Sequence, residues 1–216
     1  MENSGSFFLD AATPEAMDTL WAEGWRHFGT FFFFEQFNEE DNRQLAIIPL
    51  RIVLDEFSFS KSQRKLLIRN QAIRVEFLPA FIDETREVMF YKHIQRFKKN
   101  IPYSLYDFLD ENAANTPCNT LQCCLYQDNT LFAVSYFDVG AQSTSSVYAM
   151  FDPAFSELRP GIHTLLEEIK FAQALQKKYL YLGYAHQQSS FYDYKKRFNA
   201  LQAYDWEGNW AAFQAV

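Results

Sequence analysis

The arrangement that most constrains this fold is a strand-like run, a loop, an amphipathic helix and a second strand-like run in direct succession. The first run, SSVYAMFD, ends at residue 152, and the second, KYLYLGY, covers residues 178–184. Between them, Ile162, Leu165 and Ile169 begin a one-sided apolar stripe that predicts a helix over residues 162–176. Such a unit predicts two parallel strands joined by a crossover helix.

Strand-like runs at 121–126 and 131–138 precede this unit and, with 146–151, predict an antiparallel meander. The polar stretch ENAANTP at 111–117 predicts a boundary in front of the meander. We therefore expect an α+β protein with mixed, mostly antiparallel sheets. We expect two α/β lobes, an N-terminal one over residues 1–110 and a C-terminal one over residues 111–216.

The N-terminal half mixes helical and strand-like signals. Thr13-Pro14-Glu15 is typical of a helix start. Four successive phenylalanines, Phe31–Phe34, predict a strand that is buried on both faces. Pro49 predicts a sheet edge or a bulge in the strand that contains it. Further helices are expected over 60–71, 83–99 and 102–110, a helical segment over 191–198, and strands over 25–37, 45–54 and 73–78.

Composition indicates a soluble globular protein, with 48% hydrophobic and 22% charged residues. No apolar run approaches the roughly 20 residues that a membrane-spanning helix needs. The first ten residues carry acids and no cation, unlike a secretory signal. We therefore expect a cytoplasmic protein with no membrane partner. The three cysteines, Cys118, Cys123 and Cys124, and the four histidines lack metal-ligand spacing, so no metal is expected.

The charge of the chain is uneven. The net charge is −7, yet residues 61–100 carry ten cations against four anions. On the helix expected there, Lys61, Arg64, Lys65 and Arg69 share one side, and no acid lies between Lys61 and Val75. A cationic face without paired acids suits a phosphate backbone. A solvated basic surface explains the same pattern and stays open as the alternative.

Gly161 lies in the first turn of the helix between the two parallel strands. The unbonded N–H groups of a helix start attract an oxyanion, a phosphate or a carbonyl oxygen. A glycine there lets a ligand approach the backbone closely. The turn holds a single glycine, which is weak support for pyrophosphate binding, and an ordinary strand-to-helix connection remains the alternative.

Taken together, these motifs resemble a known family. The order SSVY (145–148), FDP (151–153), Gly161, YLYLGY (179–184) and YKxxF (194–198) is similar to the C-terminal domain of arginyl-tRNA–protein transferases and their bacterial leucyl-transferring relatives. GWRHFG (24–29), PLRI (49–52) and SKSQRK (60–65) resemble the same family in order. The resemblance implies acetyltransferase-like (GNAT-like) lobes. It implies transfer of Arg or Leu from aminoacyl-tRNA, a co-substrate, to the N-terminal amine of a protein that starts with Asp or Glu, without a cofactor.

On this hypothesis Asp152 accepts the proton of the attacking amine, while the hydroxyls of Tyr148 and Tyr184 orient the two substrates. Lys195 pairs with the acceptor's carboxylate. Capping of the turn before Pro153 is the alternative role of Asp152, and sheet packing that of the two tyrosines. The remaining substrate-binding candidates are Ser146, Gly161, Tyr194 and Arg51, and the tRNA-binding candidates are Lys61, Arg64, Lys65 and Arg69.

The chain departs from the family in three places. The interval 38–46, NEEDNRQLA, has no cysteine where relatives carry a cysteine cluster, so no metal site is implied there. Phe191-Tyr192 stands where relatives carry Lys-Met, so a substrate cation is missing, and the central helix has His93-Ile94 where relatives show a Tyr…His pattern. The lost cysteines and the lost lysine keep open a catalytically altered member that binds tRNA or a peptide. A second alternative is an acetyl-CoA-dependent N-acetyltransferase, which the single glycine at the helix start disfavours.

Overall fold

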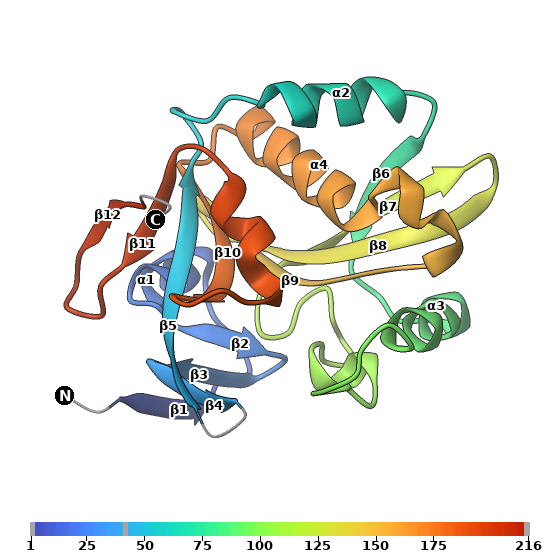
Figure 1. Ribbon diagram of the computed structural model, residues 1–216. Coiled ribbons are helices and arrows are strands. Elements are labelled where there is room, and N and C mark those ends of the chain that lie inside the picture. The colour runs from blue at the N-terminus through green and yellow to red at the C-terminus, as the bar shows by residue number, and fades with distance from the viewer. Residues whose placement is uncertain (1–2, 41–42, 214–216) are drawn as a thin grey trace.

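The computed structural model describes residues 3–40 and 43–213, and Figure 1 shows their arrangement. The α-helices are α1 (Pro14–Ala22), α2 (Lys61–Arg69), α3 (Glu84–Ile94) and α4 (Pro160–Ala174), and the 3-10 helices are η1 (Leu105–Asp107), η2 (Pro153–Leu158) and η3 (Phe191–Arg197). The strands are β1 (Ser4–Phe8), β2 (Arg26–Phe28), β3 (Phe31–Glu35), β4 (Phe37–Glu40), β5 (Arg43–Val53), β6 (Arg74–Pro79), β7 (Thr120–Gln127), β8 (Thr130–Val139), β9 (Ser143–Phe151), β10 (Tyr179–His186), β11 (Leu201–Tyr204) and β12 (Trp210–Ala212).

A mixed sheet in the order β12–β11–β5–β10–β9–β8–β7–β6 forms the body of the molecule, with β4 paired to β5. Strands β9 and β10 run parallel and are joined by α4, whereas the other neighbours in this order are antiparallel. The predicted α+β class, meander and crossover unit are therefore confirmed. Helix α4 lies over one face of β7–β9 with α2 packed against it, and α3 lies on the opposite face (Figure 1).

The main sheet draws strands from both of the expected lobes. Strands β5 and β6 come from residues 1–110, and β5 is inserted between β10 and β11 of the later residues. The sheet is thus continuous across residue 110. The division into lobes at that residue stays a prediction.

The single buried strand expected over residues 25–37 is wrong. The chain turns at Gly29, where φ is +51°, and forms the hairpin β2–β3, which β1 extends to a three-stranded antiparallel sheet. Phe32 of β3 is buried, Phe31 is 38% exposed, and Phe33 and Phe34 are half-buried. Phe32 is buried because its face of the sheet packs on Met17 and Trp21 of α1.

Pro49 has the predicted edge-like position, although β5 is inside the main sheet. Strand β11 pairs with β5 from Leu50 to Ile52, and β4 pairs with it from Arg43 to Ala46. Pro49 falls between these two partners, where its missing N–H group leaves no ladder bond unmade.

The helix starts follow the predicted caps, but one helix is shorter than expected. The Thr13 side chain accepts a hydrogen bond from the amide of Ala16, and Ser60 and Gln63 form a capping box on α2. Helix α3 ends at Ile94, because the next amides bond to carbonyls three residues back and tighten the chain into a turn. The segments expected to be helical over 102–110 and 191–198 are the 3-10 helices η1 and η3.

The apolar stripe of α4 packs into the largest hydrophobic core. Leu166 and Ile169 are fully buried against Ile52 of β5 and Leu182 of β10. Leu66 of α2 covers the same core from outside. Among the described residues, no helix combines the length and apolar character needed to cross a bilayer.

Replacing Leu166 with alanine leaves a cavity in this core. We expect the free energy of unfolding to fall by about 2–5 kcal/mol. Chemical denaturation measures the change, and Ile68→Ala on the exposed side of α2 is the control, with an expected effect within about 0.5 kcal/mol. Equal effects of the two substitutions would contradict the assignment of α4 to the core.

Candidate active site

The site is built where the two parallel strands separate. Over their described lengths, β9 and β10 pair at three positions, Ser143–Ser145 with Tyr179–Tyr181. Beyond these positions β10 stays with β5, after a register shift between Tyr181 and Gly183, and β9 stays with β8 (Figure 1). The gap between two separating strands exposes backbone groups that other residues or a ligand can bond.

Arg26 of β2 occupies the start of this separation. Its guanidinium donates hydrogen bonds to the Ser145 hydroxyl and to the Ser146 carbonyl oxygen, both on β9. On the β10 side it comes so close that a Cβ added at Gly183 would lie 3.4 Å from its nitrogens. That distance is an ordinary van der Waals contact, but Gly183 has φ +77°, a conformation that side chains disfavour and that favours glycine there.

Lys195 of η3 brings a second basic group to the same place. Its Nζ donates to the carbonyl oxygen of Tyr184 at 3.0 Å. Desolvation and the nearby charge of Arg26 lower the pKa of Lys195 to about 7. Lys195 and Arg26 are neighbouring cations with little water around them, and such a pair favours the binding of an anion. A bound anion would raise the pKa of Lys195 and so restore its charge.

Tyr184 connects the separating strand to the three-stranded sheet. Its hydroxyl lies 2.8 Å from the carbonyl oxygen of Gly24, to which it donates, and burial raises its pKa. Its ring meets that of Phe33 edge-on, with centroids 6.1 Å apart. The tyrosine thus stays a neutral donor and fixes the sheet beside Arg26.

On the opposite face, Ser146 contacts a buried acid of α4. The Ser146 hydroxyl donates to Glu168 Oε2 at 2.6 Å, and Glu168 is 2% exposed. Desolvation raises the pKa of Glu168 to about 7, although hydrogen bonds from Ser135 and Ser146 act in the other direction. Adjacent serines of β9 therefore bond a cation on one face and an acid on the other.

The start of α4 and the end of α2 lie side by side. Helix α4 begins at Pro160 and no side chain caps it. The Asn70 amide at the end of α2 donates to the Leu158 carbonyl oxygen at 2.9 Å and lies 3.1 Å from His163 Nδ1. The basic helix therefore reaches the turn that contains Gly161.

The four basic side chains expected to bind tRNA are exposed on α2. Arg64 and Arg69 donate to the carbonyl oxygens of Phe59 and Glu157. These bonds hold the two guanidinium groups against the protein surface, while Lys61 and Lys65 project from the exposed side of the helix. The structure thus puts one cationic surface beside the start of α4.

Two of the predicted catalytic residues lie toward α3. Asp152 forms an ion pair with Lys92 at 2.6 Å and accepts a hydrogen bond from the Ala154 amide at 3.0 Å. Although desolvation acts the other way, these bonds lower the pKa of Asp152. Tyr148 stacks on Phe108 with ring centroids 4.0 Å apart. These contacts fit the alternative roles, turn capping for Asp152 and packing for Tyr148, and the catalytic roles of both residues stay predictions.

Two predicted substrate-binding residues have structural partners. Arg51 lies over the rings of Tyr179 and Trp210, and its Nε donates to Gln202 at 2.8 Å. Its guanidinium is thereby held among β10, β11 and β12. Tyr194 of η3 packs against the core beneath α4. Neither contact directs these side chains to Arg26.

The sequence reasoning missed Arg26 and Glu168 as site residues. Both carry a signal that is visible in hindsight. Arg26 is the one cation in the aromatic run from Trp25 to Phe34, and Glu168 lies next to the apolar stripe of α4. A charged residue inside an otherwise buried segment points to a specific partner.

His27, Cys118 and Asp138 form the one cluster of potential metal ligands found among the described residues, with ligand atoms within 4.8 Å of one another. Asp138 is already bonded through both oxygens, at 2.8 Å to His27 and 2.7 Å to Thr120. Burial raises the pKa of the Cys118 thiol, which keeps it protonated. These residues fit a buried hydrogen-bond network that ties β2 to β8 better than a metal centre.

Comparison with known proteins agrees with this geometry. Residues 81–205 match the family described as "Arginine-tRNA-protein transferase, C terminus", which is more than half of the sequence. The chain belongs to the arginine-tRNA–protein transferase family, as its motifs predicted, and is an aminoacyl-tRNA–protein transferase.

The similar curated proteins are bacterial enzymes named aspartate/glutamate leucyltransferase. The Campylobacter jejuni enzyme is 24% identical over 193 residues, which cover 87% of this chain and 79% of the relative. The Vibrio parahaemolyticus enzyme is 29% identical over 198 residues, covering 90% and 83%.

Two solved structures share the fold at low identity. L-PGS from Bacillus licheniformis superposes with a TM-score of 0.51 and 12% identity, over 86% of this chain and 55% of that one. FemX superposes with a TM-score of 0.50 and 12% identity, over 90% and 68%. The predicted acetyltransferase-like fold class is confirmed.

The buried acid makes stability depend on pH. Because the pKa of Glu168 is raised from 4.5 to about 7, folding favours its protonated form, and this contribution is lost as pH rises through 7. We expect Glu168→Gln to flatten the fall in unfolding free energy between about pH 5 and pH 8. Urea denaturation at both pH values measures it, with exposed Glu157→Gln as the control. Parallel pH profiles for wild type and Glu168→Gln would refute the assignment.

Proposed function

We propose that this enzyme transfers leucine from leucyl-tRNA to the α-amine of proteins that begin with aspartate or glutamate. The observation that carries the proposal is the pair of cations, Arg26 and Lys195, at the separation of β9 and β10. An acidic first residue is the acceptor that such a pair selects. The names of the relatives, which specify Asp, Glu and leucine, support the same substrates.

Lys195 is the proposed partner of the acceptor's side-chain carboxylate. Its ammonium is desolvated, and Arg26 repels it, so an incoming carboxylate relieves both penalties. A lysine or neutral residue at the acceptor N-terminus offers no such relief. Discrimination among acceptors therefore follows from charge.

The donor tRNA is proposed to lie on the basic face of α2. Its 3′ end would leave α2 at the start of α4, where backbone N–H groups near Gly161 bind a phosphate, and would carry the ester on toward the separation of β9 and β10. Contacts between the end of α2 and the turn before α4 keep the two parts of this surface in fixed relation. The phosphates near the end of the tRNA are then held by one continuous region.

The reaction itself requires a neutral amine. The acceptor nitrogen forms a bond to the ester carbon, the bond from that carbon to the ribose oxygen breaks, and the proton lost by the amine ends on the departing oxygen. The cations at the site disfavour a protonated amine and so promote its neutral form. Asp152, whose carboxylate pairs with Lys92, is a weak proton acceptor, so the proton is proposed to pass to the departing oxygen.

Transfer of labelled amino acid to synthetic peptides tests the proposal. We expect leucine to be transferred to peptides starting with Asp or Glu and not to those starting with Lys. Lys195→Met raises the KM for the Glu peptide by about tenfold or more and leaves the KM for tRNA unchanged. Lys196→Met, which removes the neighbouring lysine of the same 3-10 helix that pairs with Asp193, is the matched control.

Three results would contradict this proposal in different ways. Salt-dependent tRNA binding without transfer supports a binding-only member of the family. Transfer from acetyl-CoA supports an N-acetyltransferase. Equal use of the Lys and Glu peptides leaves the transferase activity but removes the role of Lys195.

The basic face of α2 makes a second prediction. Lys61→Ala combined with Lys65→Ala reduces the slope of log affinity for tRNA against log salt by about two, because each lysine that neutralises a phosphate releases counterions. Filter binding at several salt concentrations measures the slope. Lys178→Ala, an exposed lysine beyond the other end of α4, is the control. An unchanged slope in the double variant would place the tRNA elsewhere.

A further inference from the structure

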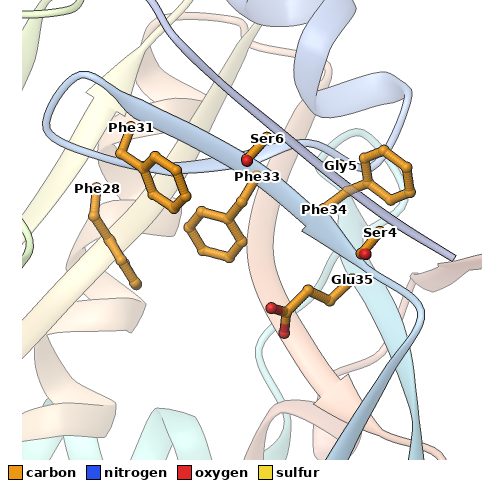
Figure 2. A pocket seen from close by; sticks show the side chains of 8 residues that line it. All are labelled: Ser4, Gly5, Ser6, Phe28, Phe31, Phe33, Phe34 and Glu35. Atoms are coloured by element: carbon orange, nitrogen blue, oxygen red, sulfur yellow. The ribbon is translucent and has the colours of Figure 1, made fainter. Parts of the chain in front are cut away.

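The three-stranded sheet carries an aromatic groove on the face opposite to α1. Side chains alternate along β3, so Phe31, Phe33 and Glu35 share one face, and Phe28 of β2 stands opposite Phe31. The groove has a volume of about 320 Å³ and includes Ser4 and Ser6 of β1. Figure 2 shows Phe28, Phe31 and Phe33 pointing to the same side, with the Glu35 carboxylate at the end of the row.

The groove is continuous with the active-site cations. Arg26 pairs with Phe33 in the sheet register, so the two side chains are neighbours on this face. The Phe33 ring contacts Tyr184, whose backbone carbonyl accepts the hydrogen bond of Lys195. An aminoacyl group bound at the separation of β9 and β10 would therefore lie next to this groove.

The chemistry of the groove differs from that of the cations beside it. The Phe33 ring is tilted against Phe28 and stacked on Phe31, with centroids 5.2 and 5.8 Å apart, which offers an apolar surface without a buried charge. Such a surface binds an aliphatic side chain and gains nothing from a carboxylate. Glu35 is exposed, so its charge is available to a cation that approaches the groove.

We propose that Phe28, Phe31 and Phe33 bind the aliphatic side chain of the donor amino acid, and that Glu35 pairs with its α-ammonium group. This assignment rests on the proposed function. An aminoacyl ester carries an apolar side chain and an ammonium group on one carbon, which matches an aromatic wall with a carboxylate at its end. The acidic acceptor does not fit, because Glu35 repels its carboxylate.

Discrimination among amino acids on one tRNA tests the groove. The same tRNA is charged with leucine, alanine or arginine, and transfer to a Glu peptide is measured. We expect Phe31→Ala to lower kcat/KM for leucine by about tenfold and to leave that for alanine unchanged, because alanine makes little contact with the ring. We expect Glu35→Gln to lower kcat/KM about equally for leucine and alanine, because both carry the α-ammonium group. Phe37→Ala, an exposed phenylalanine on β4, is the matched control.

The outcomes separate this inference from the function it rests on. If the wild-type enzyme transfers none of the three amino acids, the proposed function fails. If leucine is transferred but Phe31→Ala matches Phe37→Ala, the groove assignment alone fails. A wild-type preference for arginine that Glu35→Gln removes would overturn it as well, since Glu35 would then bind a guanidinium side chain.

Discussion

The insertion of Arg26 between β9 and β10 is the interaction on which the rest of the site depends. The guanidinium is bonded to Ser145 and Ser146 on β9 and lies next to Gly183 on β10. It thus occupies the place where the two strands separate. Its neighbour His27 points to the other face of β2 and bonds Asp138 of β8. Two successive residues thus fix the three-stranded sheet to the main sheet. That attachment brings the aromatic groove close to Lys195 of η3.

The elements that sequence predicts here are those with local causes. The capping box at Ser60 and Gln63 and the apolar stripe of α4 each contain their own signal within a few residues. The four phenylalanines led to a wrong prediction because a run of identical residues does not show which positions face the core and which face away from it. Gly29, whose left-handed conformation makes the turn, was the sign of a hairpin in that run. The short strands β1, β4, β11 and β12 have little local pattern and depend on distant partners.

The candidate site was less accessible to sequence reasoning than the fold. Gly161 and the basic face of α2 could be singled out because a helix start and a run of cations are local features, and their binding roles stay predictions. Arg26 was missed because its meaning arises from Ser145, more than a hundred residues away. Asp152 has the right residue type for a proton acceptor, and the sequence does not show that its carboxylate forms an ion pair with Lys92 of α3. The family resemblance supplied the reaction class, and the structure supplied the neighbours of each side chain.

The separation of β9 and β10 is built into backbone pairing and does not require a moving lid. Strand β10 is held to β5 at seven paired positions, from Tyr179 to His186, so its path is set by the sheet. Folding of the chain therefore supplies the free energy that holds the two strands apart. Substrates meet a scaffold whose strand paths are already fixed, and binding them needs little reorganisation of it. In an enzyme with two macromolecular substrates, a rigid scaffold means that the flexible ends of the tRNA and of the acceptor protein adjust their conformation to the site.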